Sequence, residues 1–272
     1  MIYITTALAC EAKPLISHLR LKKLTEHVAF PCYRNDDVCL IVSGMGRVAM
    51  AAATAYIAAS QVAPQENNVW LNVGVAGHGD FGLGTAILAD KVVEEGSDKT
   101  WYPLYVFSPE LNTSTLKTVD RPQLNYLDDF AYDMEGSAFI ETASRFTSFE
   151  LIHLFKVISD NRDSGVAHID KAYVAELIES KLSTLEGVIS SLRSVQSVMD
   201  DGGRELEDYE CLLSAVTFSF SQQQQLRRLL QRYYSFDGDR AVAEQLMGEF
   251  SSAKRILKEL EQRVDDLALT KS

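Results

Sequence analysis

Short apolar runs alternate with segments of helical character along the first 199 residues. Runs rich in β-branched residues predict strands at 1–8, 28–34, 38–43, 69–75, 85–93, 115–119 and 151–158. Helical spacing of apolar residues predicts helices over 12–24, 47–61, 134–146 and 170–199. The run 69–75 is almost continuously apolar, which is typical of a strand buried on both faces of a sheet. The alternation predicts an α/β fold with a central mixed, mainly parallel sheet.

Residues 200–272 show no strand pattern and are predicted to form a helical C-terminal extension. The boundary is placed at Asp200-Asp201-Gly202-Gly203, which divides the chain into an α/β domain, 1–199, and the extension, 200–272. Within the extension, a heptad-like apolar seam runs through Leu246, Phe250, Ala253, Leu257, Leu260, Val264 and Leu267. Such a seam fits either helices that fold back on the main domain or a contact with a second copy or another partner.

Composition narrows the classes of function. The chain has 272 residues, 46% of them hydrophobic, and a formal charge of -12. The acidic balance argues against nucleic-acid binding, which needs an excess of Lys and Arg to neutralise phosphates. The chain's start lacks the basic region and apolar core of a signal peptide, and no apolar run approaches the roughly 20 residues of a membrane span. We expect a cytoplasmic protein with no membrane partner.

The sequence contains no pattern for a metal or an organic cofactor. Its four cysteines form no CxxC pair, and no His/Cys cluster has zinc spacing. The glycines from Gly74 to Gly84 are predicted to form a loop after an apolar strand. They match neither a phosphate-binding loop ending in GK[ST] nor the dinucleotide fingerprint. Glycines at the carboxyl end of a strand do let a ligand approach the backbone, and open α/β sheets bind ligands at that end.

Three acidic residues stand at predicted ends of elements. Glu11 follows the first strand, Glu135 lies at the start of a helix, and Asp160 ends the last strand. Each by itself fits a structural role, since a carboxylate at a helix start usually caps the helix or meets its dipole. Their order and surroundings favour a shared chemical role instead.

Four sequence blocks resemble the nucleoside phosphorylase/nucleosidase superfamily, most closely the methylthioadenosine/S-adenosylhomocysteine nucleosidases. The blocks are Ala7-Leu8-Ala9-Cys10-Glu11-Ala12, Val42-Ser43-Gly44-Met45-Gly46-Arg47-Val48, Asn72-Val73-Gly74-Val75-Ala76-Gly77, and Asp133-Met134-Glu135-Gly136-Ser137-Ala138 with Ile158-Ser159-Asp160. They occur in the family's order. The resemblance implies a three-layer αβα arrangement with no cofactor, a small purine nucleoside as ligand, and a homo-oligomer, most simply a homodimer.

The resemblance also implies roles for single residues in cleaving the bond between a purine and its ribose. Asp160 matches the acid at the leaving base, and Glu11 matches the base that activates water. Glu135 matches the acceptor of the ribose hydroxyls, and Met134 would pack against the sugar. The remaining substrate-binding residues implied by the family pattern are Ser43, Gly44, Val75, Ala76, Gly77, Asp133 and Ser159.

The segment after the first strand favours hydrolysis over phosphorolysis. Phosphorylases of this superfamily usually have a glycine-rich, arginine-containing segment there, whereas this chain has Cys10-Glu11-Ala12-Lys13-Pro14. Arg47 is the only obvious cation within a matching block. A purine nucleoside phosphorylase is the first alternative, in which phosphate would be a second ligand.

The segment 96–129 departs from the family pattern because it is compressed. The aromatic residue that would stack on the base is therefore unassigned, with Phe107, Tyr126 and Phe130 as candidates. Together with the C-terminal extension, this departure motivates a second alternative, a non-catalytic protein that binds a nucleoside or a partner.

Overall fold

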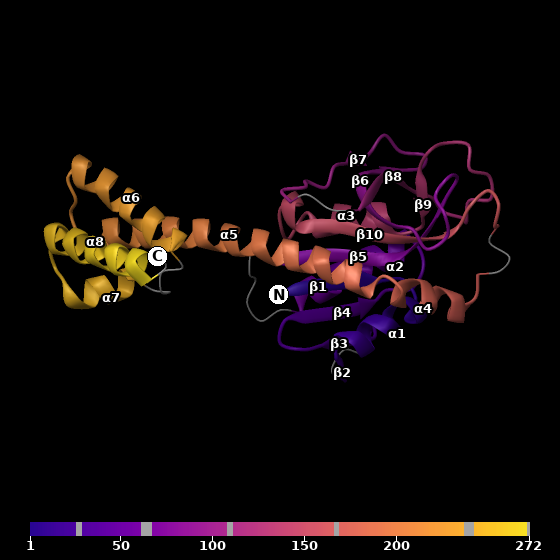
Figure 1. Ribbon diagram of the computed structural model, residues 1–272, viewed down its shortest axis with the longest axis horizontal. Coiled ribbons are helices and arrows are strands. Elements are labelled where there is room, and N and C mark those ends of the chain that lie inside the picture. Colours follow the sequence, from indigo (N-terminus) through magenta and orange to yellow (C-terminus); the bar gives the residue numbers. More distant parts are fainter. Residues whose placement is uncertain (26–28, 61–66, 108–110, 166–168, 237–241, 271–272) are drawn as a thin grey trace. The chain divides into compact units, whose positions relative to one another are not determined.

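The computed structural model describes residues 1–25, 29–60, 67–107, 111–165, 169–236 and 242–270 (Figure 1). The chain forms two compact units, Met1–Gln196 and Ser197–Ser272. The first unit contains a large mixed sheet with helices and the second is helical, so the predicted α/β fold with a C-terminal helical region is confirmed. Among the described residues, none of the helices combines the length and the apolar character needed to cross a membrane.

The elements have the following bounds. The strands are β1 (Ile2–Thr6), β2 (Lys22–Leu24), β3 (Cys32–Arg34), β4 (Val38–Val42), β5 (Val69–His78), β6 (Ala86–Glu94), β7 (Thr100–Trp101), β8 (Asn112–Thr118), β9 (Ala131–Asp133) and β10 (Ile152–Asp160). The helices of the first unit are α1 (Ala9–His18), α2 (Arg47–Ala59), α3 (Gly136–Ala143), the 3-10 turn η1 (Phe149–Leu151) and α4 (Lys171–Glu179). Helix α5 (Leu182–Ala215) continues into the second unit, which adds α6 (Phe220–Ser235), α7 (Val242–Glu249) and α8 (Ala253–Thr270).

The sheet has an open part and a part that closes on itself. β1 lies between β4 and β5 with parallel pairings, and β3 and β2 extend this part antiparallel. On the other side, β5 pairs with β10, β10 with β6, β6 with β8, β8 with β9, and β9 again with β5. β5 serves both parts because it is long: residues 69–72 pair with β1, and its last two residues pair with β9 along the same edge. Along its other edge, β5 brings Gly77 opposite Asp160 of β10.

Helices cover the sheet through apolar faces. Helix α2 buries Met50, Ala53 and Ile57, which lie three and four positions apart and therefore on one helical face. It packs with α3, while α1 packs with α4. The core beneath them includes the fully buried rings of Trp70 and Phe139.

The first predicted helix was misplaced. Helix α1 starts at Ala9 rather than at position 12, and it ends because Arg20 adopts a left-handed φ of 53°. Lys22–Leu24 then pair with β3 instead of continuing the helix. The strand predicted over 28–34 spans Cys32–Arg34, and the helix predicted over 134–146 spans Gly136–Ala143. Positions 28 and 61, which the predictions also included, lie outside the described residues.

The helix predicted over 170–199 is two helices. Helix α4 ends at Glu179, where the Ser180 hydroxyl donates to the Leu177 carbonyl at 2.8 Å and so satisfies one of the helix's last carbonyls. Helix α5 then runs through 200–203, where the domain boundary was placed. A glycine costs a helix about 1 kcal/mol relative to alanine, and two glycines do not end a helix of this length.

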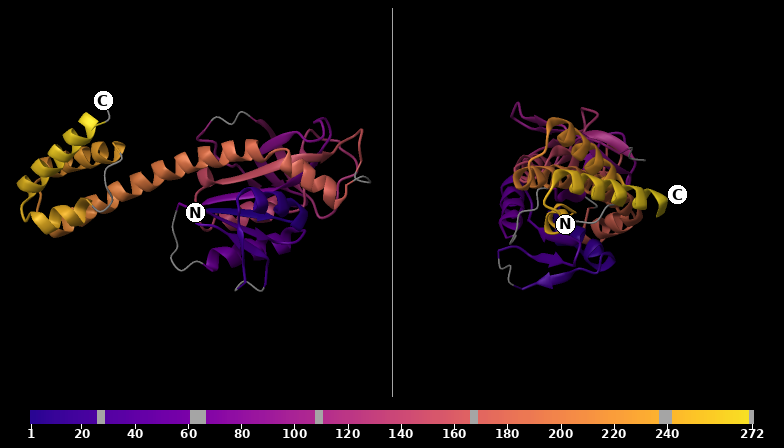
Figure 2. Two further views of the ribbon diagram at one scale, coloured as in Figure 1. Left: turned by 60° about the horizontal axis from the view of Figure 1, so that its bottom comes forward. Right: turned by 90° about the vertical axis from the view of Figure 1, so that its left-hand side faces the viewer.

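The second unit has an apolar core of its own. Helices α6, α7 and α8 pack with the C-terminal part of α5 around this core (Figures 1 and 2). The predicted heptad-like seam lies inside it, with Leu246, Ala253, Leu257, Leu260 and Val264 buried and with Phe250 and Leu267 packed against them. The seam therefore holds α7 and α8 within the unit, a use that neither interpretation of the sequence anticipated.

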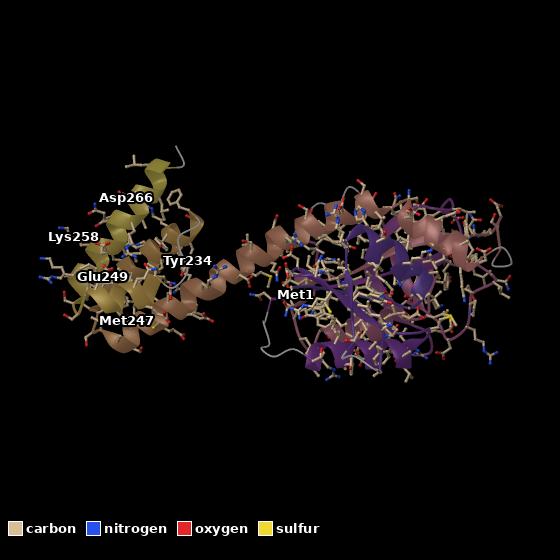
Figure 3. All side chains as sticks on the ribbon, turned by 90° about the horizontal axis from the view of Figure 1, so that it is seen from below. Met1, Tyr234, Met247, Glu249, Lys258 and Asp266 are labelled. Carbon is tan, nitrogen blue, oxygen red and sulfur yellow. The ribbon has the colours of Figure 1, made fainter. Side chains whose placement is uncertain are left out.

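A hydrogen bond between two side chains links α6 to α5 in the helical unit. Figure 3 labels Tyr234 among the side chains of the helical unit. The Tyr234 hydroxyl of α6 donates to the Asp208 carboxylate of α5 at 2.5 Å. Among the described residues of this unit there is no strand.

Candidate active site

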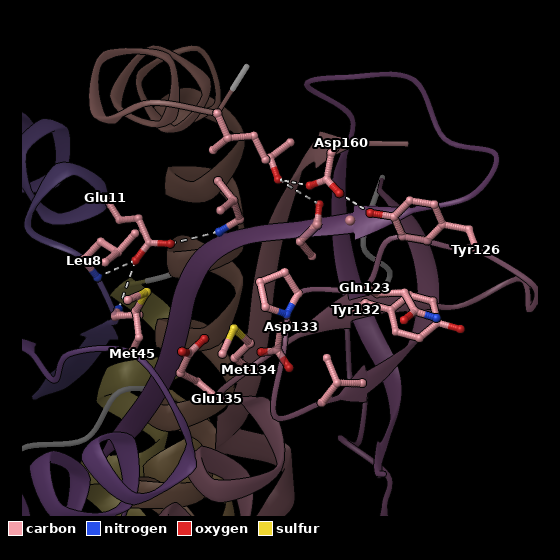
Figure 4. A pocket seen from close by; sticks show the side chains of 18 residues that line it. Leu8, Glu11, Met45, Gln123, Tyr126, Tyr132, Asp133, Met134, Glu135 and Asp160 are labelled. Carbon is pink, nitrogen blue, oxygen red and sulfur yellow. Dashed lines mark hydrogen bonds between the residues drawn. The ribbon is translucent and has the colours of Figure 1, made fainter. Parts of the chain in front are cut away.

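A pocket of about 300 Å³ opens where β1, β5 and β10 end (Figure 4). Of the eleven predicted site residues, the nine that line it are Glu11, Val75, Ala76, Gly77, Asp133, Met134, Glu135, Ser159 and Asp160. Other lining side chains come from Leu8, Met45, Gln123, Tyr126 and Tyr132. Among the described residues, no Lys or Arg lines the pocket, so its charged lining consists of four carboxyl groups.

Glu11 is held in the first turn of α1 by backbone N–H groups. Its Oε2 accepts hydrogen bonds from the N–H groups of Ala7 and Leu8, at 3.0 and 2.8 Å, and its Oε1 accepts from the N–H of Val75 at 3.1 Å. The side chain is buried. Burial raises the pKa of Glu11, while the charge of Lys156 and these N–H donors oppose that rise. A carboxylate offers about four acceptor sites, so three N–H bonds leave one for a ligand or a water.

The glycines of β5 make room for the carboxyl groups. Gly74 and Gly77, predicted to lie in a loop, are inside the strand. A Cβ atom on Gly74 would lie 2.7 Å from Glu11 Oε1, and one on Gly77 would lie 2.7 Å from Asp160 Oδ2. These positions therefore need glycine for close approach of a side chain rather than for a turn.

Ser43 and Gly44 do not line the pocket. Both backbone N–H groups bond back to the end of β1, to the carbonyls of Thr6 and Ala7 at 2.9 and 3.0 Å. Their turn serves the site through its next residues. Met45 lines the pocket, and the N–H of Gly46 donates to Glu135 Oε1 at 2.6 Å.

Asp133 and Glu135 lie at the junction of β9 and α3. Asp133 accepts hydrogen bonds from the Thr118 hydroxyl at 2.7 Å and from the N–H of Gly136 at 2.8 Å. Glu135 is buried, and this burial, together with repulsion from Asp133, raises its pKa to about 7. The charge of Lys156 and the N–H of Gly46 oppose the rise.

Lys156 was not among the predicted site residues. It stands in the middle of β10, is buried, and places its Nζ 3.0 Å from Asp133 Oδ2. Burial opposes the charge of its ammonium group, but Asp133, Glu135 and Glu11 together raise the pKa of Lys156 above its ordinary value. The sequence does contain a signal for it, since Lys156 is the only charged residue between Ile152 and Ser159.

Asp160 ends β10 with both carboxylate oxygens hydrogen-bonded. The Ser159 hydroxyl donates to Oδ1 at 2.6 Å, and the Tyr126 hydroxyl donates to Oδ2 (Figure 4). Tyr126 was one of three candidates for stacking on the base. The other two do not line the pocket: Phe107 packs on His153, and Phe130 packs behind the lining on Val119, Tyr126 and Tyr132.

Arg47 is engaged by acidic residues outside the pocket. Its guanidinium lies 3.1 Å from Glu94 Oε1 and 2.6 Å from Asp120 Oδ1. In the described part of the chain, no group of three or more His, Cys, Asp and Glu side chains is arranged to hold a metal ion.

Several solved structures are similar to this chain in their fold. The chain is similar to the 5′-methylthioadenosine nucleosidase of Arabidopsis thaliana, with a TM-score of 0.59 and 15% identity over 70% of this chain and 95% of that one. It is also similar to a methylthioadenosine/S-adenosylhomocysteine nucleosidase of Colwellia psychrerythraea in complex with adenine, with a TM-score of 0.55 and 20% identity over 70% and 93% of the two chains. The protein has the nucleosidase fold.

A third similar structure is a futalosine hydrolase mutant of Helicobacter pylori, with a TM-score of 0.52 and 15% identity over 70% of this chain and 98% of that one. The resemblance inferred from the four sequence blocks is therefore confirmed at the level of the fold, between divergent chains. No family model matches the chain, and no curated protein matches it in sequence.

Proposed function

We propose that the protein hydrolyses the N-glycosidic bond of an adenosine-type purine nucleoside, such as methylthioadenosine or S-adenosylhomocysteine. The observation that carries the proposal is one pocket lined by Glu11, Glu135 and Asp160 and, among the described residues, by no basic side chain. Figure 4 draws Glu11 and Asp160 on different sides of this pocket, which suits two groups that act on opposite ends of one bond. The nucleosidase fold supports the same class of substrate.

The chemistry needs an acid at the base and a general base at the sugar. As the bond breaks, negative charge develops on the purine and positive charge on the ribose. Asp160, in its acid form, is the source of the proton that neutralises the leaving purine. Glu11, with one acceptor site left on its carboxylate, takes a proton from the attacking water. Each such group typically contributes about 10²–10⁴-fold to a rate.

The residues between these two groups bind the ribose. Glu135 accepts hydrogen bonds from the sugar hydroxyls, and Met134 packs against the ring; both line the pocket. The N–H of Gly46 holds Glu135 at 2.6 Å, so the acceptor is in position before a ligand arrives. Such preorganisation reduces the entropy lost on binding.

Phosphorolysis is disfavoured by the charges of the pocket. A phosphate dianion needs cationic or N–H donors, and charge-assisted bonds to Arg or Lys are the strongest of these. Arg47 is paired with Glu94 and Asp120, and Lys156 is paired with Asp133. Water therefore suits this pocket better as the nucleophile.

The test is release of free base, measured by chromatography. Purified protein is incubated with methylthioadenosine, S-adenosylhomocysteine, adenosine and inosine, each with and without phosphate, beside the Asp160→Asn variant. We expect phosphate-independent release that the variant reduces by about 10²-fold or more. Release that requires phosphate would make the protein a phosphorylase. If none of these compounds releases a base, the proposed hydrolysis of them is refuted. The alternative is then a protein that binds a nucleoside or a partner, and binding measurements with the same compounds would test it.

A further inference from the structure

Asp160 does not face the pocket alone. One of its oxygens accepts from Ser159, and the other accepts from the Tyr126 hydroxyl, so both are occupied by protein hydroxyl groups. Tyr126 itself lines the pocket beside Asp160. A purine nitrogen that approaches Asp160 Oδ2 therefore meets the Tyr126 hydroxyl at the same place.

Several contacts hold Tyr126 there. Gly77 has no side chain, and a Cβ at that position would collide with both the Tyr126 hydroxyl and Asp160. From the other direction, Arg162 Nε donates to the carbonyl of Tyr126 at 3.0 Å, while its guanidinium pairs with Asp80 at 2.5 Å. Tyr126 is only 6% exposed. Its ring is therefore held in a fixed position in the pocket wall.

We propose that the Tyr126 hydroxyl donates its proton to the leaving purine and that Asp160 replaces it with a proton of its own. This inference rests on the proposed hydrolysis. The hydrogen bond between Tyr126 Oη and Asp160 Oδ2 can have either group as its donor. When Asp160 is a carboxylate, the phenol donates to it; when Asp160 is a carboxylic acid, it donates to the phenol oxygen, and the phenol proton is free for the ligand.

The relay conserves both protons and electrons. The bond between C1′ and the purine nitrogen breaks, and its electron pair goes to the purine. The Tyr126 proton moves to the purine, and the Asp160 proton moves to Tyr126 Oη, which leaves Asp160 as a carboxylate held by Ser159. Water adds to C1′ and gives a proton to Glu11. Exchange through solvent carries that proton from Glu11 back to Asp160.

The surroundings couple the two proton transfers. Burial, and then the bond to Asp160, raises the pKa of Tyr126, so the phenol by itself is a weak acid and gives up its proton only as the Asp160 proton reaches its oxygen. Oriented tyrosine hydroxyls in a pocket that excludes water are effective donors to charge that develops during a reaction.

A double-mutant cycle on adenine release from methylthioadenosine tests the relay, with Tyr126→Phe, Asp160→Asn and the double variant. Two groups that pass one proton act as a unit. Each single variant should therefore lower kcat by about 10²–10⁴-fold with little change in KM, and the double variant should be no slower than the slower single one. Tyr234→Phe is the matched control, since it removes a Tyr–Asp bond in the helical unit and should leave kcat unchanged.

Other outcomes overturn the relay. Faster turnover by Tyr126→Phe would mean that the tyrosine only competes for Asp160, and a raised KM with unchanged kcat would reduce Tyr126 to a binding contact. Losses that multiply in the double variant would make the two residues independent. Thermal unfolding of each variant shows whether a loss of rate comes from loss of fold. Absence of turnover in the wild-type protein would instead overturn the proposed hydrolysis of this compound, and the relay with it.

Discussion

Replacing Gly74 by alanine places a methyl group against the Glu11 carboxylate. The new carbon would lie 2.7 Å from Oε1, whereas ordinary contact begins near 3.4 Å, so the oxygen must move by about 0.7 Å. A move of that size is enough to break the bond that Oε1 accepts from Val75 at 3.1 Å. Displacements approaching 1 Å in an active site cost about 10²-fold in rate. We therefore expect kcat/KM for base release to fall by about that factor.

The effect on stability should be smaller than the effect on rate. Loss of one hydrogen bond to a charged group costs about 1.5–3 kcal/mol, and alanine in place of glycine returns about 0.4–1 kcal/mol by restricting the unfolded chain. Urea unfolding should therefore show a net loss of about 1–2 kcal/mol, which leaves the protein folded in the assay. Wild-type activity in this variant would refute the reasoning that Gly74 is needed to position Glu11.

Gly187→Ala provides the matched control for Gly74→Ala. Gly187 is an exposed residue of α5, and nothing lies within 4 Å of the position that its Cβ would take. Alanine there should stabilise the helix by about 1 kcal/mol and leave base release unchanged. A loss of activity in this control would show that the assay responds to Gly→Ala changes outside the pocket.

Two further predictions concern the buried charges. Lys156→Met should destabilise the protein by about 3–5 kcal/mol in urea unfolding, because it leaves the Asp133 carboxylate buried without its cation. Adding Asp133→Asn should recover part of this loss. An unchanged urea midpoint in the single variant would contradict the pairing. The pKa of Glu135 is about 7 in the folded protein against 4.5 for the free group, so the folded state binds a proton on Glu135 more tightly than the unfolded state does. This proton contributes about 3 kcal/mol to the free energy of unfolding below pH 4.5, and the contribution is lost as pH rises through 7. Urea midpoints from pH 4.5 to 8 should fall less steeply with pH in Glu135→Gln, and identical slopes would refute the shift.

Elements set by local pattern could be predicted from the sequence, and elements set by distant contacts could not. The long, mostly apolar runs 69–75 and 151–158 correspond to β5 and β10, because a strand buried on both faces consists mainly of apolar residues. By contrast, nothing in the apolar pattern shows that β9 returns to the edge of β5 already used by β1. Helix α5 passes through Gly202 and Gly203 because a helix of 34 residues outweighs a propensity penalty of about 1 kcal/mol for each glycine.

The candidate site divides in the same way. Glu11, Glu135 and Asp160 could be named from their sequence blocks, and all three line one pocket. Tyr126 lies in a segment with little periodicity, so only the fold shows that its hydroxyl reaches Asp160. Ser43 and Gly44 were placed in the site by their block, but neither lines the pocket, and their backbone N–H groups bond to the end of β1.

The charge of the pocket bears on the reaction as well as on binding. Asp133 is paired with Lys156, and Glu135, with its raised pKa, is only partly ionised near neutral pH. Glu11 and Asp160 therefore face a ligand in a lining that contains no cation among the described residues. A neutral nucleoside gains little from such a pocket in its ground state. In the proposed hydrolysis, the ribose becomes positively charged as the glycosidic bond breaks, and the Glu11 carboxylate then stabilises it more than it stabilised the substrate. The negative charge of the pocket would repel an incoming phosphate dianion. The same charge that lowers the barrier to hydrolysis therefore raises the barrier to phosphorolysis.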